Sequence, residues 1–230
     1  LKRLMTEGGI DASLHVDDAV TTTVKLRVIG RQQQLLRIDF ETTPSHEILQ
    51  AKLSEFERRV AACDAVVLSD YGKGGLTHIA EMIALARAAG KPVLVDPRGD
   101  EWSKYAGATV ITPNRSELRE VVGRWTSEAD LAARVQKLRG ELGLDALLVT
   151  RSEEGMTLFA ADEQHHQPAQ AREVFDVSGA GDTVIATLAV MVAAGAGWAE
   201  AIRTANVAAG IVVGKLGTAV VTREELAAAL

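Results

Sequence analysis

The sequence is poor in the residue types that mark disulfide-rich, membrane-spanning and nucleic-acid-binding proteins. Among 230 residues there is one cysteine, Cys63, so no disulfide can form within the chain and a reducing, cytoplasmic setting is expected. No apolar run reaches the roughly 18 residues of a membrane helix, and no membrane partner is expected. Aromatic residues make up 4%, and the net charge of −6 comes without a basic patch. A nucleic-acid partner is therefore not expected either.

The first forty residues differ in pattern from the rest. Residues 22–29 and 34–40 alternate apolar with polar side chains, and a glycine-containing break separates them. This period of two predicts a β-hairpin with one covered face and one wet face. We expect a partial N-terminal region over residues 1–43 that carries this hairpin, and a core domain over residues 44–230. Leu1 is not an initiator methionine, so we also expect residues upstream of this sequence.

From residue 65 onward, short apolar runs alternate with helical patterns. The runs cover residues 65–69, 93–95, 109–111 and 146–149, with a second hairpin at 155–159 and 164–167. Helical periodicity covers residues 77–89, 116–122, 128–142, 179–194 and 198–213. This alternation predicts an α/β fold of three layers, with a largely parallel sheet between two layers of helices.

Polar residues follow the carboxyl ends of the predicted strands. They are Asp70, Lys73, Asp96, Arg98, Asn114 and Arg151. Ligands of such sheets bind beyond the carboxyl ends of the strands, so we expect these residues to line one edge of the sheet, beside a binding site.

The segment from Asp176 to Asp182 carries the strongest chemical signal. Gly179, Ala180 and Gly181 follow an extended stretch at residues 173–177 and open a helix. The first N–H groups of a helix lack partners and attract anions, and small residues let a phosphate approach them. Asp182 can accept the proton of an attacking hydroxyl. By itself, a Gly-Ala-Gly-Asp string is more often a plain helix start with an acid in its first turn.

The longer string Asp-Val-Ser-Gly-Ala-Gly-Asp resembles the signature of the ribokinase-like (PfkB) carbohydrate kinases. The resemblance implies that Gly179, Ala180 and Gly181 form an anion hole and that Asp182 is the catalytic base. Val177 stands where threonine is commonest, a change that affects neither feature. The resemblance further implies a ribokinase-like fold, ATP and Mg²⁺ as cofactors, with a monovalent cation in addition, and a lid formed by the hairpin.

Three more segments match this family in the same order. Asn114 and Glu117 fit its N-x-x-E motif, which implies that they place Mg²⁺ and the phosphates through water; the same spacing also suits a helix cap. Residues 150–155 match the nucleotide turn, usually T-x-G-x-x-G, with Ser152 in place of the first glycine. The implied ATP-site residues there are Thr150, Arg151, Ser152, Glu153 and Gly155. Asn206 falls in the helix that flanks the adenine in relatives.

Longer stretches, among them residues 67–74, 148–156 and 212–218, resemble the heptose-phosphate kinases of this family. This implies ATP-dependent phosphorylation of D-glycero-β-D-manno-heptose 7-phosphate at its anomeric hydroxyl, giving the 1,7-bisphosphate for ADP-heptose and lipopolysaccharide core biosynthesis. It also implies a homodimer through the lid hairpin. Candidate substrate residues are Lys25, Arg27, Asp70, Lys73 and Arg98.

Other functions stay open from the sequence alone. One is a ribokinase-like kinase for another sugar or a nucleoside, and another is a non-catalytic regulator that binds nucleotide or sugar. A Rossmann dehydrogenase and a P-loop kinase are disfavoured, because neither G-x-G-x-x-G after an early strand nor G-x-x-x-x-G-K-[ST] occurs.

Overall fold

A six-stranded sheet runs through the body of the protein in the sequential order β3-β4-β5-β6-β7-β8. The computed structural model describes residues 1–31, 33–170 and 174–230. The main-sheet strands are β3 (Val66–Ser69), β4 (Val93–Asp96), β5 (Val110–Ile111), β6 (Ala146–Thr150), β7 (Met156–Ala160) and β8 (Gln164–Gln167). The first four are parallel, whereas β7 and β8 are antiparallel to their neighbours.

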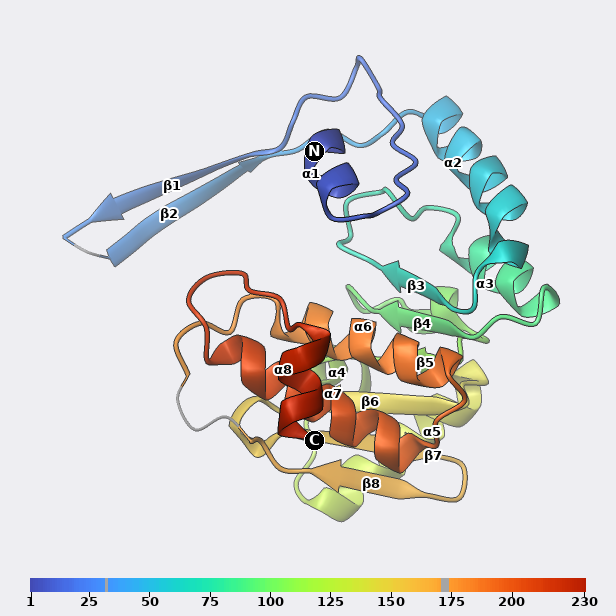
Figure 1. Cartoon of the computed structure of the whole chain (residues 1–230), viewed down its shortest axis with the longest axis vertical. Helices are drawn as coiled ribbons and strands as arrows, with labels where there is room; N and C mark the ends of the chain where they lie inside the picture. The colour runs from blue at the N-terminus through green and yellow to red at the C-terminus, as the bar shows by residue number, and fades with distance from the viewer. Residues whose placement is uncertain (32, 171–173) are drawn as a thin grey trace.

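Helices cover both faces of this sheet, as Figure 1 shows. The helices in the described part of the chain are α1 (Lys2–Glu7), α2 (His46–Arg59), α3 (Ile79–Ala88), α4 (Arg115–Val122), α5 (Glu128–Leu142), α6 (Ala180–Ala193), α7 (Trp198–Val213) and α8 (Arg223–Ala229). Right-handed crossovers between successive parallel strands place their helices on one face. The helices α3, α4 and α5 lie there, and the pair α6 and α7 covers the other face. The expected three-layer α/β/α fold is confirmed.

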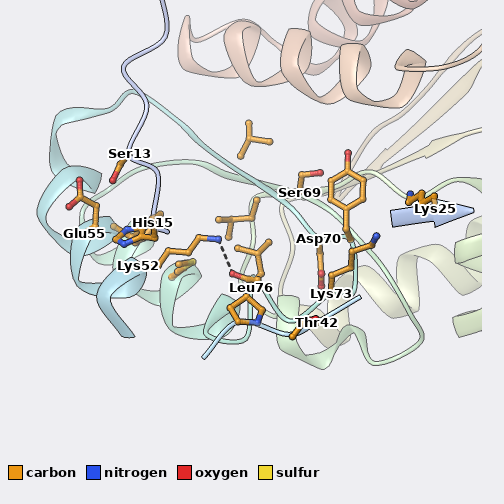
Figure 2. Close-up of a pocket in the computed structure, with 17 residues that line it drawn as sticks. Ser13, His15, Lys25, Thr42, Lys52, Glu55, Ser69, Asp70, Lys73 and Leu76 are labelled. Atoms are coloured by element: carbon orange, nitrogen blue, oxygen red, sulfur yellow. Dashed lines mark hydrogen bonds between the residues drawn. The ribbon is translucent and has the colours of Figure 1, made fainter. Parts of the chain in front are cut away.

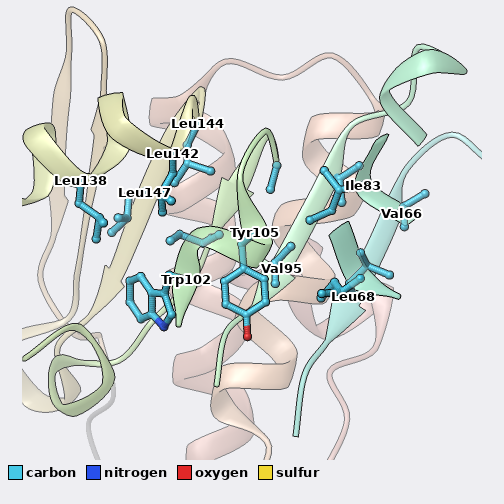
Figure 3. Packing of buried hydrophobic residues seen from close by; sticks show 14 of the residues in the cluster. Val66, Leu68, Ile83, Val95, Trp102, Tyr105, Leu138, Leu142, Leu144 and Leu147 are labelled. Atoms are coloured by element: carbon cyan, nitrogen blue, oxygen red, sulfur yellow. The ribbon is translucent and has the colours of Figure 1, made fainter. Parts of the chain in front are cut away.

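The buried side chains of each strand alternate between the two faces. Val93 and Val95 pack on the α3 side with Trp102 and Tyr105, while Leu94 packs on the α6 side. Figure 3 shows the first of these clusters. Because both faces are covered at β4, β5 and β6, these strands are almost entirely apolar, and this apolarity made them recognisable in the sequence.

The hairpin at residues 22–40, here called the lid hairpin, consists of β1 (Val24–Gly30) and β2 (Gln33–Phe40). The expected covered face is wrong for the single chain. Nearly all described residues of both strands are exposed, because the hairpin projects from the body and no other layer in the described part of the chain packs on it (Figure 1).

The remaining sequence predictions agree closely with the elements. Each predicted core strand and helix is present with its bounds shifted by a few residues, and the hairpin of β7 and β8 extends the main sheet. The extended stretch predicted at residues 173–177 starts outside the described residues. Sequence reasoning missed α1, α2 and α8. Among the described residues, no helix has the length and apolarity to cross a membrane.

Candidate active site

The start of α6 leaves backbone N–H groups free to bind an anion. Gly179 precedes the helix with φ of 80°, and Ser178 N–H donates to Asp176 Oδ1 at 2.8 Å, which shapes the turn. No side chain caps the helix, and the N–H groups of Gly181 and Asp182 have no backbone acceptor among the described residues. Added Cβ atoms at Gly179 and Gly181 would meet nothing within 4 Å. The turn therefore faces open space, as an anion hole requires.

Asp182 lies exposed in the first turn of α6, in the electrostatic range of a second carboxylate, Asp96. Asp96 ends β4 and accepts a hydrogen bond of 3.4 Å from Ser69 Oγ. Burial, then the charges of Glu117 and Asp182, raise the pKa of Asp96 to about 6. Sequence reasoning placed Asp96 at this edge but gave it no role; the structure brings it within the electrostatic range of the expected base.

A cavity of about 520 Å³ on one side of the α6 turn brings the predicted nucleotide residues together. Its lining includes Thr150, Ser152, Glu153, Gly155, Ala180, Gly181 and Asn206. Apolar residues of α6 and α7, such as Val184 and Val213, complete its wall. The Asn206 side chain also donates to Pro168 O at 2.8 Å, so it is held in place. An apolar cavity that ends at free N–H groups suits a nucleotide.

Arg151 is the exception among these residues. Its guanidinium does not line the cavity and is instead paired with Glu128 and Glu154, with 8% of its side chain exposed. Glu128 lies at the start of α5 and Glu154 within the turn itself. The structure thus places the Arg151 side chain behind the nucleotide turn.

Asn114 and Glu117 form a capping box at the start of α4. Asn114 Oδ1 accepts from the N–H groups of Ser116 and Glu117 at 2.8 and 3.0 Å, and Glu117 Oε2 accepts from Asn114 N–H at 3.0 Å. Glu117 Oε1 also accepts from Arg98 Nη1 at 3.3 Å. The two residues cap the helix and also line a polar cavity of about 580 Å³ with Arg98; their role in placing Mg²⁺ stays a prediction.

The largest of these cavities, about 830 Å³, lies under the base of the lid hairpin and beside β3 (Figure 2). Of the predicted substrate residues, Lys25, Asp70 and Lys73 line it. Arg27 and Arg98 do not; Arg27 lies farther along β1, and Arg98 lines the polar cavity.

Asp70 has little capacity left for a ligand. Its Oδ2 accepts from Lys104 Nζ and Tyr105 Oη, each at 2.8 Å, and its Oδ1 accepts from Gly72 N–H at 2.8 Å. Burial opposes its charge, but Lys104 and the Gly72 N–H outweigh it and hold the pKa of Asp70 below its usual value. Asp70 therefore fixes the loop after β3 against Tyr105.

Two residues that sequence reasoning missed, His15 and Lys52, also line the cavity under the lid hairpin. Lys52 Nζ donates to Gly75 O at 2.8 Å, and burial lowers its pKa (Figure 2). His15 comes from the segment between α1 and β1. No local motif marks either residue, since both reach the cavity only through the tertiary fold.

Comparison with known proteins identifies the relatives of this chain. The model of the pfkB family of carbohydrate kinases matches residues 1–225. A D-beta-D-heptose 7-phosphate kinase of Bordetella bronchiseptica is 56% identical over 227 residues, which cover 99% of this chain and 72% of the relative. The bifunctional protein HldE of Hahella chejuensis is 54% identical over 226 residues, 96% of this chain but 47% of that protein. The chain thus spans about half the length of this relative.

Solved structures agree on the fold. Ribokinase from Giardia lamblia superposes with a TM-score of 0.80 at 20% identity, covering 100% of this chain and 78% of that chain. At this identity the likeness concerns the fold alone. It agrees with the three layers and with the sheet described above.

Proposed function

Because this chain belongs to the pfkB family of carbohydrate kinases, we propose that it transfers the γ-phosphoryl group of ATP to the anomeric hydroxyl of D-glycero-β-D-manno-heptose 7-phosphate. The product is the 1,7-bisphosphate, a precursor for ADP-heptose and the lipopolysaccharide core. The observation that carries this function is the place of Asp182. It lies in the first turn of a helix whose start, at Ala180 and Gly181, lines a nucleotide-sized cavity.

The apolar cavity beside α6 takes the nucleotide. Val184 and Val213 contact the base and ribose, and Asn206 lies at the same wall. The triphosphate extends toward the N–H groups of Gly181 and Asp182, where the charge that develops on the transferred group is stabilised.

The cavity under the lid hairpin takes the acceptor sugar. Lys25, Lys52 and Lys73 supply positive charge to a cavity that Glu55 and the already paired Asp70 also line, so cations outnumber carboxylates there, which suits an acceptor that already carries a phosphate. Ser69 lines this cavity and donates to Asp96, and Asp96 lies within the electrostatic range of Asp182 at the helix start. The acceptor hydroxyl lies at Asp182, which takes its proton as the bond to phosphorus forms.

The residues at the start of α4 fit a magnesium ion held through water. Asn114 and Glu117 already use some of their oxygen lone pairs in the capping box, so they are not open for full direct ligation. Each Glu117 oxygen has one protein partner and retains capacity to accept from a bound water. When bound, Mg²⁺ neutralises charge on the phosphates.

The lid hairpin has the form expected of a dimer contact. Val24, Leu26 and Val28 pair across the hairpin with Phe40, Ile38 and Leu36, which gives one apolar face. All six side chains are exposed in the single chain. Lys25 lies on the opposite face and lines the acceptor cavity. A second copy covering the apolar face would leave the polar face directed at the sugar. We place the reaction in the cytoplasm, where ATP is supplied.

The decisive experiment compares wild type with Asp182→Asn in an ATP-coupled assay on a panel of phosphorylated and free sugars. Heptose 7-phosphate should be the preferred acceptor. Asp182→Asn should lower kcat roughly 100- to 10,000-fold while ADP still binds, because the amide cannot take the proton but keeps the size of the side chain. Near-normal turnover of Asp182→Asn would refute the assignment of the base. A different preferred sugar would refute the heptose assignment alone.

A further inference from the structure

The guanidinium of Arg151 is held by two carboxylates behind the nucleotide turn. Nη1 and Nη2 donate to Glu128 Oε2 and Oε1 at 2.7 and 2.6 Å, which is a bidentate pair. Nη2 and Nε donate to Glu154 Oε2 at 2.6 and 3.1 Å. Since 8% of the Arg151 side chain is exposed, these pairs are largely shielded from solvent on the arginine side. They therefore fix the arginine in one geometry.

The same pairs join three elements at the edge of the sheet. Glu128 is the first residue of α5, and Glu154 belongs to the turn between β6 and β7. Glu154 Oε1 also accepts from Arg115 Nη1 at 2.5 Å, and Arg115 is the first residue of α4, next to Asn114. The nucleotide turn is thus tied to the helix start that lines the polar cavity.

The turn has a backbone shape that its sequence does not favour. Ser152 has φ of 54°, in the left-handed region where residues other than glycine pay a conformational penalty. Ser152 also lines the nucleotide cavity. Arg151 N–H donates to Gly155 O at 2.8 Å, which closes the turn around it. A residue remains in such a conformation only where the surrounding contacts determine it.

We propose that Arg151 is a positioning residue for the nucleotide. Its ion pairs with Glu128 and Glu154 hold Ser152 in the left-handed shape in which the turn receives ATP, and so replace the conformational freedom of a glycine at that place. Arg151 does this without touching the nucleotide, since its side chain lies outside the cavity. This inference rests on the proposed function in one respect, that ATP is the donor.

The test is a double-mutant cycle between Arg151→Met and Ser152→Gly. Arg151→Met should raise the KM for ATP and the Kd for ADP, measured by calorimetry, about tenfold or more, with the sugar KM within about twofold. In the Ser152→Gly background, the same Arg151→Met change should cost about threefold or less, because glycine adopts the turn without help. A purely structural role for Arg151 would not be relieved by glycine at a neighbouring position.

Lys137→Met serves as the matched control, because Lys137 lies on α5 with Glu128 in an exposed pair with Glu141. It should leave both KM values unchanged. If Arg151→Met fails to fold, Glu128→Gln weakens the bidentate pair from its exposed side and should raise the Kd for ADP severalfold.

Three outcomes would overturn the inference. They are an unchanged Kd for ADP in Arg151→Met, an equal effect of Arg151→Met in both backgrounds, or an unchanged Kd in Glu128→Gln. A wild-type protein that binds no ADP would refute the proposed function instead, so the two failures can be told apart.

Discussion

The nucleotide side and the acceptor side of the site are built in opposite ways. The nucleotide cavity is lined by the ends of β6 and β7 and by the buried faces of α6 and α7, all part of the packed core. The acceptor cavity takes Lys25 from the lid hairpin, His15 from the segment before it and Lys52 from α2. The nucleotide half is built on the core, whereas the acceptor half combines the end of β3 with the lid hairpin and the segment before it.

This difference indicates where each half obtains its shape. The nucleotide turn is fixed by contacts within the chain. At Gly155 these contacts are so close that even a Cβ atom would clash with the backbone of Gln167. The lid hairpin has an apolar face that no other part of the described chain covers. Substitutions in the nucleotide half should therefore change both the free energy of unfolding and the KM for ATP. Substitutions in the acceptor half should instead change dimer formation and the KM for the sugar.

The largest effect is expected for Gly155→Ala on the nucleotide side. Gly155 has φ of 86°, and a Cβ there would lie 2.0 Å from Gln167 O, on the backbone of β8. The turn must shift, and we expect a loss of about 3 kcal/mol or more in the free energy of unfolding, with a large rise in the KM for ATP. Urea unfolding and ATP titration measure both quantities.

Gly140→Ala is the matched control for Gly155→Ala. Gly140 lies inside α5, and an added Cβ would meet nothing within 4 Å. Alanine should stabilise the protein there by roughly 0.5–1 kcal/mol. If Gly155→Ala unfolds at the same urea concentration as wild type, the nucleotide turn is more adaptable than the core around it, and the contrast between the halves fails.

An intermediate effect is expected for Leu26→Asp on the apolar face of the lid hairpin. Two copies of the charge would enter a symmetric interface, and we expect self-association to weaken by about 2 kcal/mol. Analytical ultracentrifugation measures the loss of dimer. The KM for the sugar should rise while the Kd for ADP stays constant, because Leu26 is remote from the nucleotide cavity.

Arg37→Gln tests whether this effect belongs to the apolar face. Arg37 lies on the opposite face of the hairpin, opposite Arg27, and its change should leave the dimer intact. If the wild-type protein sediments as a monomer at every concentration, the proposed dimer contact through the lid hairpin is wrong. The apolar face of the hairpin would then be exposed to solvent.

The sequence was sufficient wherever local chemistry decides the structure. The apolar strands, the helix that begins after Gly179 and the turn at residues 150–155 are all found as predicted. The motif at Asn114 predicted its position correctly, but a cap and a ligand site use the same residues at the same spacing, so the pattern could not separate the two.

Sequence reasoning failed where contacts join distant segments. Arg151 was assigned to the ATP site because it belongs to the nucleotide turn. Its partner Glu128 is 23 positions away in the sequence, and the pair holds the Arg151 side chain behind the turn. Lys52 reaches its cavity through α2, a helix that was not predicted. The covered face of the lid hairpin was expected from the alternation of apolar and polar side chains along its strands. This alternation shows that one face is apolar, but it does not show which surface covers that face.

The smallest effect is expected for Asp96→Asn, at the point where the two halves meet. Burial and the nearby carboxylates raise the pKa of Asp96 to about 6, so the native state binds this proton more tightly than the unfolded chain does. Stability from this group is therefore complete below the unfolded pKa of 3.8 and is lost as pH rises toward 6. Since Asp96 is only partly buried, we discount the penalty at pH 7 to about 1 kcal/mol.

Asp96→Asn removes that penalty, so it should raise Tm by about 2–4 °C at pH 7 and leave Tm unchanged near pH 4. Thermal melts of both proteins at the two pH values measure the difference. A sharper test is whether the gain in Tm from Asp96→Asn depends on Asp182, because Asp182→Asn removes one of the charges that raise the Asp96 pKa. The gain from Asp96→Asn should therefore shrink in the Asp182→Asn background. An undiminished gain would mean that the carboxylates at the junction of the two halves do not interact.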